Sequence, residues 1–128
     1  MSLDNGEESP NQAAQQAGAQ SSPVQLQILI GERGLTPLLQ LAGEIDMASV
    51  PFLHETYDQV CCEPGSSLIV DLSGVTFLDS SGLAILISIH EELEARGAQL
   101  TILTPTPSVR RLLGITGLDS VFEIEPLV

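Results

Sequence analysis

An almost continuously apolar strand, a short polar loop and a strongly apolar helix follow one another between residues 67 and 95, and this order constrains the fold more than any other segment. The strand, Leu68–Leu72, has the character of a central strand that is covered on both faces. The helix, expected from about Ser81 to Ala95, is apolar nearly all round in its first two turns. Such a helix is either wrapped on several sides or offers apolar surface to a partner.

The loop between them places Asp79 and two serines, Ser80 and Ser81, at the start of that helix. The first backbone N–H groups of a helix lack intrahelical acceptors and carry a partial positive charge, so this position favours capping side chains and anions such as phosphate. A serine hydroxyl placed there can be a cap, a nucleophile or a phosphoacceptor. Which of the three applies determines the function.

The rest of the folded part alternates strands and helices. We expect a hairpin, then helices and strands in turn: strands 24–28 and 35–42, helix 49–62, strand 100–103, a helix opened by Pro107, and a strand 121–124. The order ββαβαβαβ predicts an α/β fold, with a mixed sheet and helices packed against it in a single domain, residues 24–128. Residues 1–23 are rich in Gln, Ala, Ser, Asn and Glu, and are predicted to be a disordered N-terminal tail.

Charge excludes several classes of function. The net charge is -13, with 17 acidic residues against 4 basic ones, so nucleic acid and anionic membrane surfaces are not expected partners. The chain has no lysine, which excludes a P-loop, a Schiff-base enzyme, a kinase and a phospho-receiver built on Asp71. We expect no signal peptide, because the N-terminal stretch is acidic and polar, and no transmembrane helix, because no run of about 18 apolar residues occurs. A cytoplasmic protein is expected.

Catalysis and metal binding are not expected either. The segment from Asp79 to Gly82 lacks the first glycine of a G-x-S-x-G motif, and the two histidines, His54 and His90, lie on other parts of the chain or well along the helix. Adjacent Cys61 and Cys62 cannot form a disulfide on a helix without distorting the backbone. They form a structural or incidental pair or, alternatively, have a redox-responsive or intermolecular role. We predict no enzyme, no metal and no cofactor.

A phosphoacceptor role suits the serine loop better than a catalytic role does. A phosphate on Ser80 adds about -1.5 to -2 charge, which the start of the helix tolerates through its dipole and free N–H groups. A partner docked over the loop would not tolerate it, because of phosphate burial, bulk and repulsion by Asp79 and Asp46. Losing about 3 kcal/mol of binding would weaken a complex more than 100-fold.

The run from Leu78 to Leu83 closely resembles the phosphorylation loop of bacterial anti-sigma factor antagonists, members of the STAS-domain family. Three more segments resemble that family in the same order: 43–46 (GEID), 68–77, and 107–112 with Gly117 and Leu118. The resemblance covers about residues 24 to 126. It implies a STAS-like fold for the domain.

The resemblance also implies a partner-switching, stress-response type of transcription regulator without catalytic activity. The unphosphorylated antagonist would bind an anti-sigma factor with a histidine-kinase-like ATPase fold and free its sigma factor. That kinase would inactivate it by phosphorylation, and a serine phosphatase would restore it. Ser80 matches the phosphoacceptor, with Ser81 as the alternative. The implied partner-binding residues are Asp46, Asp79, Ser81, Gly82 and Leu83.

The sequence leaves two alternatives open. One is a non-catalytic STAS subunit of a membrane transport ATPase or of a stress-signalling complex, which would use the same apolar helix as a permanent interface. The other is an antagonist gated by oxidation of Cys61 and Cys62, which have no counterpart in the general pattern of the family.

Overall fold

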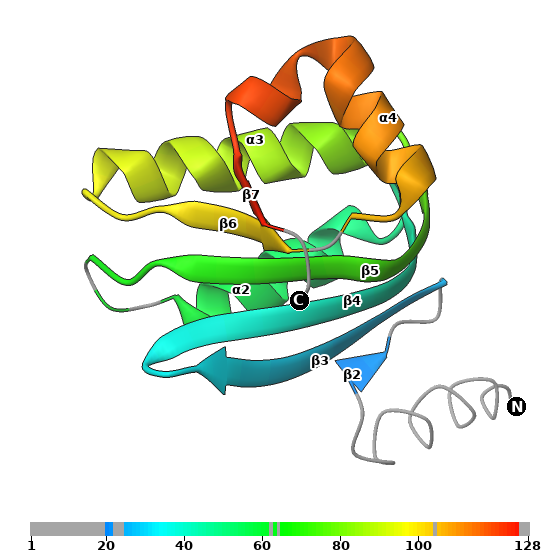
Figure 1. Ribbon diagram of the computed structural model, residues 1–128. Coiled ribbons are helices and arrows are strands. Elements are labelled where there is room, and N and C mark those ends of the chain that lie inside the picture. Colours follow the sequence, from blue (N-terminus) through cyan, green and yellow to red (C-terminus); the bar gives the residue numbers. More distant parts are fainter. Residues whose placement is uncertain (1–19, 22–24, 62, 64, 104, 126–128) are drawn as a thin grey trace, which may run out of the picture.

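The protein forms one layer of strands with helices packed against it, in a computed structural model that describes residues 20–21, 25–61, 63, 65–103 and 105–125 (Figure 1). The strands are β2 (Gln20–Ser21), β3 (Leu26–Arg33), β4 (Thr36–Ile45), β5 (Leu68–Leu78), β6 (Leu100–Leu103) and β7 (Glu123–Glu125). The helices are α2 (Val50–Val60), α3 (Ser80–Ala95) and α4 (Pro107–Thr116), followed by a 3₁₀ turn, η2 (Leu118–Ser120). The predicted mixed sheet with helices packed against it is confirmed.

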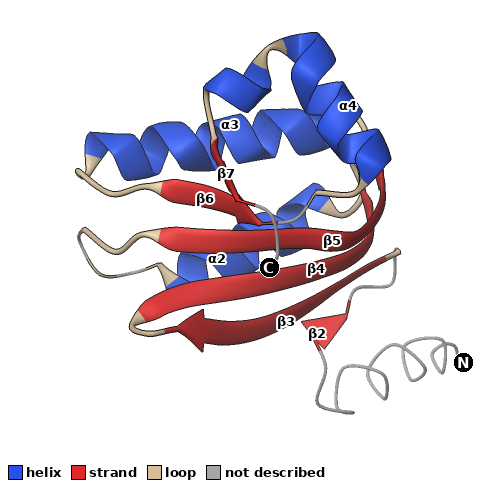
Figure 2. Ribbon diagram, in the orientation of Figure 1, coloured by secondary structure: helices blue, strands red, loops and turns tan. Residues whose placement is uncertain are grey.

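The described strands belong to a single sheet in the order β2-β3-β4-β5-β6-β7 (Figure 2). The pairs β2–β3 and β3–β4 are antiparallel, whereas β4–β5, β5–β6 and β6–β7 are parallel. Each parallel connection runs through a helix, because a hairpin cannot join parallel neighbours. β5 lies inside the sheet, between β4 and β6, and α3 begins two residues after its last residue.

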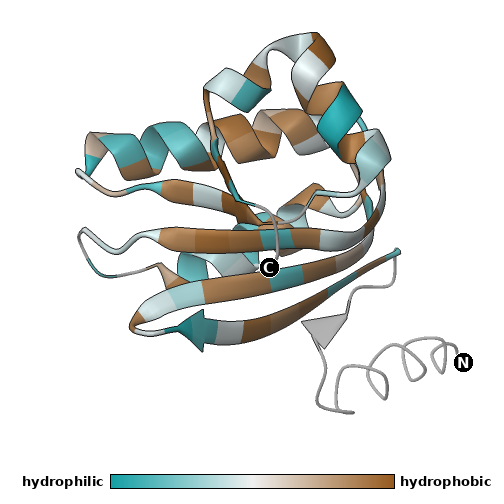
Figure 3. Cartoon of the chain, in the orientation of Figure 1, coloured by the Kyte–Doolittle hydropathy of each residue, from teal (hydrophilic) through white to brown (hydrophobic). Residues whose placement is uncertain are grey.

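One hydrophobic core lies on the helix-bearing face of the sheet. Figure 1 shows α2 behind the sheet, and the core joins strand residues such as Val70 and Leu72 to Leu53 of α2 and Leu86 of α3, each of them fully buried. The first half of α3 is hydrophobic and its second half largely hydrophilic (Figure 3). Both halves contribute to the core, because Leu83 and Leu86 of the first half and Ile89 and Leu93 of the second are buried.

The central strand is longer than predicted. The predicted strand Leu68–Leu72 is buried throughout, but β5 continues to Leu78. Its added part pairs with β4, from Ala42 opposite Gly74 to Ile45 opposite Leu78, with one irregularity in register just before this stretch and a second within it. Exposed residues interrupt the apolar pattern there, so the extension depends on a tertiary neighbour that a local pattern does not report.

Part of the segment predicted to be a disordered tail takes part in the sheet. Gln20 and Ser21 form β2 and pair with Ile28 and Gln27 of β3. Residues 1–19, 22 and 23 of the predicted tail lie outside the described residues. The boundary between tail and domain stays a prediction.

Candidate functional site

The loop between β5 and α3 is held by the side chain that caps the helix. Asp79 has extended backbone angles, φ -104° and ψ -170°, and its Oδ1 accepts a hydrogen bond from Gly82 N at 3.1 Å. Its carbonyl oxygen accepts from Leu83 N at 3.0 Å. Of the three possible roles of this loop, capping therefore belongs to Asp79, and α3 begins at Ser80.

Ser80 is left accessible at the first position of the helix. The residue is exposed, and its hydroxyl makes no hydrogen bond to the part of the chain that the structure describes. The backbone N–H groups of Ser80 and Ser81 likewise have no acceptor among the described residues. Two free donors at the positive end of a helix dipole favour a phosphate group on Ser80.

A second loop, between β4 and α2, lies beside the first. Asp79 N donates to Ile45 O at 3.3 Å, which joins the two loops directly. Asp46 follows Ile45, and its Oδ1 accepts from Ala48 N and Ser49 N, both at 3.1 Å. The buried Ser49 hydroxyl in turn accepts from Asp46 N at 2.9 Å. This network places the Asp46 carboxylate at the start of α2 in a defined geometry, next to the serine loop.

Two of the predicted partner-binding residues, Gly82 and Leu83, lie buried beneath the two loops. Gly82 is buried, and a Cβ added to it would overlap Leu78 Cδ1 and lie 2.9 Å from Ile45 O. Leu83 is also buried, as part of the core. Gly82 lets the two loops approach each other closely, and Leu83 packs in the core beneath them. Ser81, in contrast, is only half-buried.

An apolar groove of about 400 Å³ opens beside the loops, between the first turns of α2 and α3. Its lining residues are Met47, Val50, Pro51, Ser81, Ala84 and Ile85. Met47 is 75% exposed, so the groove has an apolar rim that nothing in the described part of the chain covers. The groove shares Ser81 with the serine loop, and Ser81 directly follows Ser80 in the first turn of α3.

The groove residues on α2 were not identified from the sequence. The all-round apolar start of α3 did predict a surface for a partner, and Ala84 and Ile85 belong to that stretch. Met47, Val50 and Pro51 gave no comparable signal, because they join the groove only when α2 packs beside α3. An apolar methionine directly after Asp46 is the one local hint.

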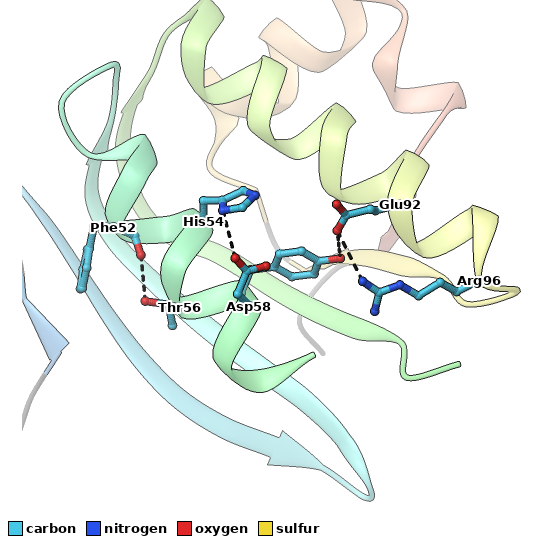
Figure 4. Close-up of polar contacts among 7 residues, drawn as sticks. Phe52, His54, Thr56, Asp58, Glu92 and Arg96 are labelled. Atoms are coloured by element: carbon cyan, nitrogen blue, oxygen red, sulfur yellow. Dashed lines mark hydrogen bonds and ion pairs between the residues drawn. The ribbon is translucent and has the colours of Figure 1, made fainter. Parts of the chain in front are cut away.

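The far ends of α2 and α3 are joined by a polar cluster (Figure 4). The Tyr57 hydroxyl donates to Glu92 Oε1 at 2.6 Å, Arg96 lies 3.7 Å from the same oxygen, and Arg96 Nη1 donates to the Cys61 carbonyl at 3.1 Å. Burial of the phenol, together with the bond to Glu92, raises the pKa of Tyr57 well above its ordinary value. This cluster fixes the two helices relative to each other, and so fixes the groove at their opposite ends.

The remaining candidate residues lie away from the loop. The thiol of Cys61 is buried at the end of α2, and Cys62 lies outside the described residues. His54 Nδ1 lies 3.3 Å from Asp58, and His90 Nε2 lies 3.8 Å from Glu94, each one turn along the same helix (Figure 4 for His54). Among the described residues, no group of three or more His, Cys, Asp or Glu is placed to hold a metal ion, and no helix is long and apolar enough to cross a membrane.

Known proteins with similar sequences share this domain. The anti-sigma-F factor antagonist RsfB of Mycobacterium tuberculosis is 28% identical over 104 residues, which are 81% of this chain and 84% of that protein. The anti-sigma-B factor antagonist of Listeria monocytogenes is 32% identical over 85 residues, which are 66% of this chain and 75% of that protein.

A solved structure and a family model agree with these relatives. The crystal structure of an anti-sigma factor antagonist from Mycobacterium paratuberculosis superposes with a TM-score of 0.73 at 31% identity, covering 84% of this chain and 92% of that one. The family model of the STAS domain matches residues 27–128, from the second residue of β3 to the end of the chain. The order of the elements, the capped serine loop and these matches together show that the chain belongs to the STAS-domain family.

Proposed function

We propose that this protein is an anti-sigma factor antagonist that binds its anti-sigma factor over the serine loop and the adjoining apolar groove. The observation that carries the proposal is the position of Ser80, an exposed residue next to Ser81, which lines a groove together with Met47 and Ile85. Relatives that carry the same domain are named as antagonists of anti-sigma factors. The protein acts by binding, in the cytoplasm where sigma factors work, and catalyses no reaction of its own.

The switch is phosphorylation of Ser80. The partner is an anti-sigma factor of the histidine-kinase-like ATPase type, which transfers the γ-phosphoryl group of ATP to the Ser80 hydroxyl, and a serine phosphatase reverses the step. Supporting this, the amides of Ser80 and Ser81 are free to receive the phosphate within the described structure, so the fold survives the modification. The docked partner would have to bury about two negative charges beside the carboxylates of Asp46 and Asp79, so the complex dissociates.

Contact with the partner is made by Asp46, Asp79, Ser81 and the groove. Gly82 and Leu83 act indirectly, because both are buried and shape the loop. The buried thiol of Cys61 gives no support for gating by oxidation. Phosphorylation at Ser80 therefore accounts for more of the described geometry than a redox switch does.

The test is capture from the native lysate, with identification of bound proteins by mass spectrometry. Wild type and Ser80→Ala are expected to capture an ATPase of the histidine-kinase-like type, and Ser80→Asp is not. The matched control is Ser88→Asp, which adds the same charge at an exposed serine of the same helix and should leave capture unchanged. Equal capture by Ser80→Asp and wild type would refute the switch.

The captured ATPase then serves to identify the acceptor. With labelled ATP, the wild type and Ser81→Ala are expected to become phosphorylated, whereas Ser80→Ala is not. Label that persists in Ser80→Ala and disappears in Ser81→Ala would assign the phosphate to Ser81.

A further inference from the structure

The sheet face opposite the core holds a buried carboxylate, that of Asp71, which has no cationic partner among the described residues. Asp71 lies on β5 and is 4% exposed. Its neighbours Val70 and Leu72 point into the core, so the Asp71 side chain points to the other face. Asp71 Oδ1 accepts from Ser73 N at 2.9 Å, and no ion pair of Asp71 exists among the described residues.

None of the basic side chains in the described part of the chain forms an ion pair with Asp71. The chain contains four arginines, two histidines and no lysine, and all six of these basic side chains belong to the described residues. Arg33 pairs with Glu125 at 3.3 Å and Arg96 with Glu92 at 3.7 Å, and each histidine lies beside an acid of its own helix. The other two arginines lie on α4, whose buried residues belong to the core on the opposite face.

Asp71 lies at a cavity of about 200 Å³ on this face. The strands place Leu29, Gln40, Asp71 and Leu103 side by side in one transverse row. The cavity is lined by polar groups around Asp71, including Gln27, Gln40 and Ser73, and by Leu29, which is 53% exposed. Amide and hydroxyl groups that can donate or accept hydrogen bonds thus lie around the carboxylate, with apolar surface beside them.

We propose that this face binds a segment of a protein partner that inserts an arginine or lysine side chain into the cavity, with Asp71 as the acceptor. A carboxylate removed from water is unfavourable unless a cation or several donors pair with it. A guanidinium or ammonium group supplies charge-assisted hydrogen bonds, and an anion is repelled by Asp71 and by the net charge of -13. Leu29 extends the surface beyond the cavity, which suits a peptide chain more than a small free amine.

This surface is separate from the one assigned to the anti-sigma factor. Asp71 faces away from the core in the first half of β5, whereas Ser80 lies beyond the end of the same strand. The proposal therefore stands whether or not Ser80 is phosphorylated, and it predicts a second partner that binds at the same time.

The test is an NMR titration of the ¹⁵N-labelled chain with the capped tripeptide acetyl-Leu-Arg-Leu-amide. We expect saturable shifts of the amide signals of Gln40 and Ser73. The matching peptide with Gln in place of Arg should bind at least about tenfold more weakly, as should butylguanidinium, which carries the cation without a peptide. Absence of saturation would overturn the site, and equal binding of butylguanidinium would overturn the protein partner.

Variants of the chain assign the effect to the carboxylate. Asp71→Asn keeps the acceptor for Ser73 N and should weaken the Arg peptide roughly 10- to 100-fold. Glu32→Gln removes an exposed carboxylate of β3 and should change nothing. Equal losses in these two variants, or no loss in Asp71→Asn, would overturn the proposal. If Asp71→Asn does not fold, Gln40→Glu tests the proposal instead. A second carboxylate in the cavity should tighten binding of the Arg peptide, and unchanged or weaker binding would overturn the proposal.

Discussion

Replacing Gly82 by alanine tests whether the close approach of the two loops governs the site. In an open helix the change would stabilise the protein by about 0.5–1 kcal/mol, because alanine loses less backbone entropy. Here the new Cβ overlaps Leu78 Cδ1 and lies 2.9 Å from Ile45 O and 3.0 Å from Ile45 Cγ2. A group of buried atoms must move, and overpacking of this kind costs about 1–3 kcal/mol.

We therefore expect Gly82→Ala to lower the free energy of unfolding by about 1–2 kcal/mol. The same movement displaces Ile45 O, which accepts from Asp79 N, so partner capture should fall as well. The assay is urea denaturation followed by circular dichroism, since the chain has no tryptophan. With an m-value of about 1–2 kcal/mol/M, the midpoint falls by roughly 1 M.

Gly114→Ala is the matched control. Gly114 is also inside a helix, but its added Cβ would meet only Asp119 Oδ2, at an ordinary 3.7 Å. This variant should gain about 0.5–1 kcal/mol. If Gly82→Ala is as stable as Gly114→Ala, the steric argument for the loop is wrong.

Three further predictions concern the cap, the polar cluster and the groove. Asp79→Ala removes the acceptor of Gly82 N and should cost about 0.5–2 kcal/mol in the same denaturation assay, most of which Asp79→Asn restores. Because the pKa of Tyr57 is raised on folding, the unfolded chain loses its phenol proton first, near pH 10. Stability should thus fall by about 1.4 kcal/mol per pH unit above pH 10, and Tyr57→Phe should reduce that slope by this amount. Met47→Gln, at a 75% exposed position, should change stability by less than about 0.5 kcal/mol while weakening capture of the anti-sigma factor, and unchanged capture would remove Met47 from the interface.

The order of the elements and the chemistry of the serine loop could be predicted from the sequence alone. Hydrophobic periodicity reports on one element at a time, so it located the strand at Leu68–Leu72 and the helix after Asp79. A helix cap joins residues only three positions apart, as Asp79 and Gly82 are. The sequence could therefore predict that a side chain of the serine loop caps the helix. The absence of lysine also excluded lysine chemistry, because composition does not depend on how the chain folds.

Properties that depend on contacts between separate helices and strands could not be predicted from the sequence. The extension of β5 to Leu78 depends on its pairing with β4, and the steric role of Gly82 depends on Ile45, which lies 37 positions earlier. The groove exists because α2 packs beside α3, which brings Met47 next to Ile85. That Asp71 is buried without an ion pair among the described residues could not be predicted either. Whether two charged side chains pair depends on whether the fold places them on the same face of the sheet. Each of these properties belongs to two elements at once, and a pattern within one element carries no information about the other.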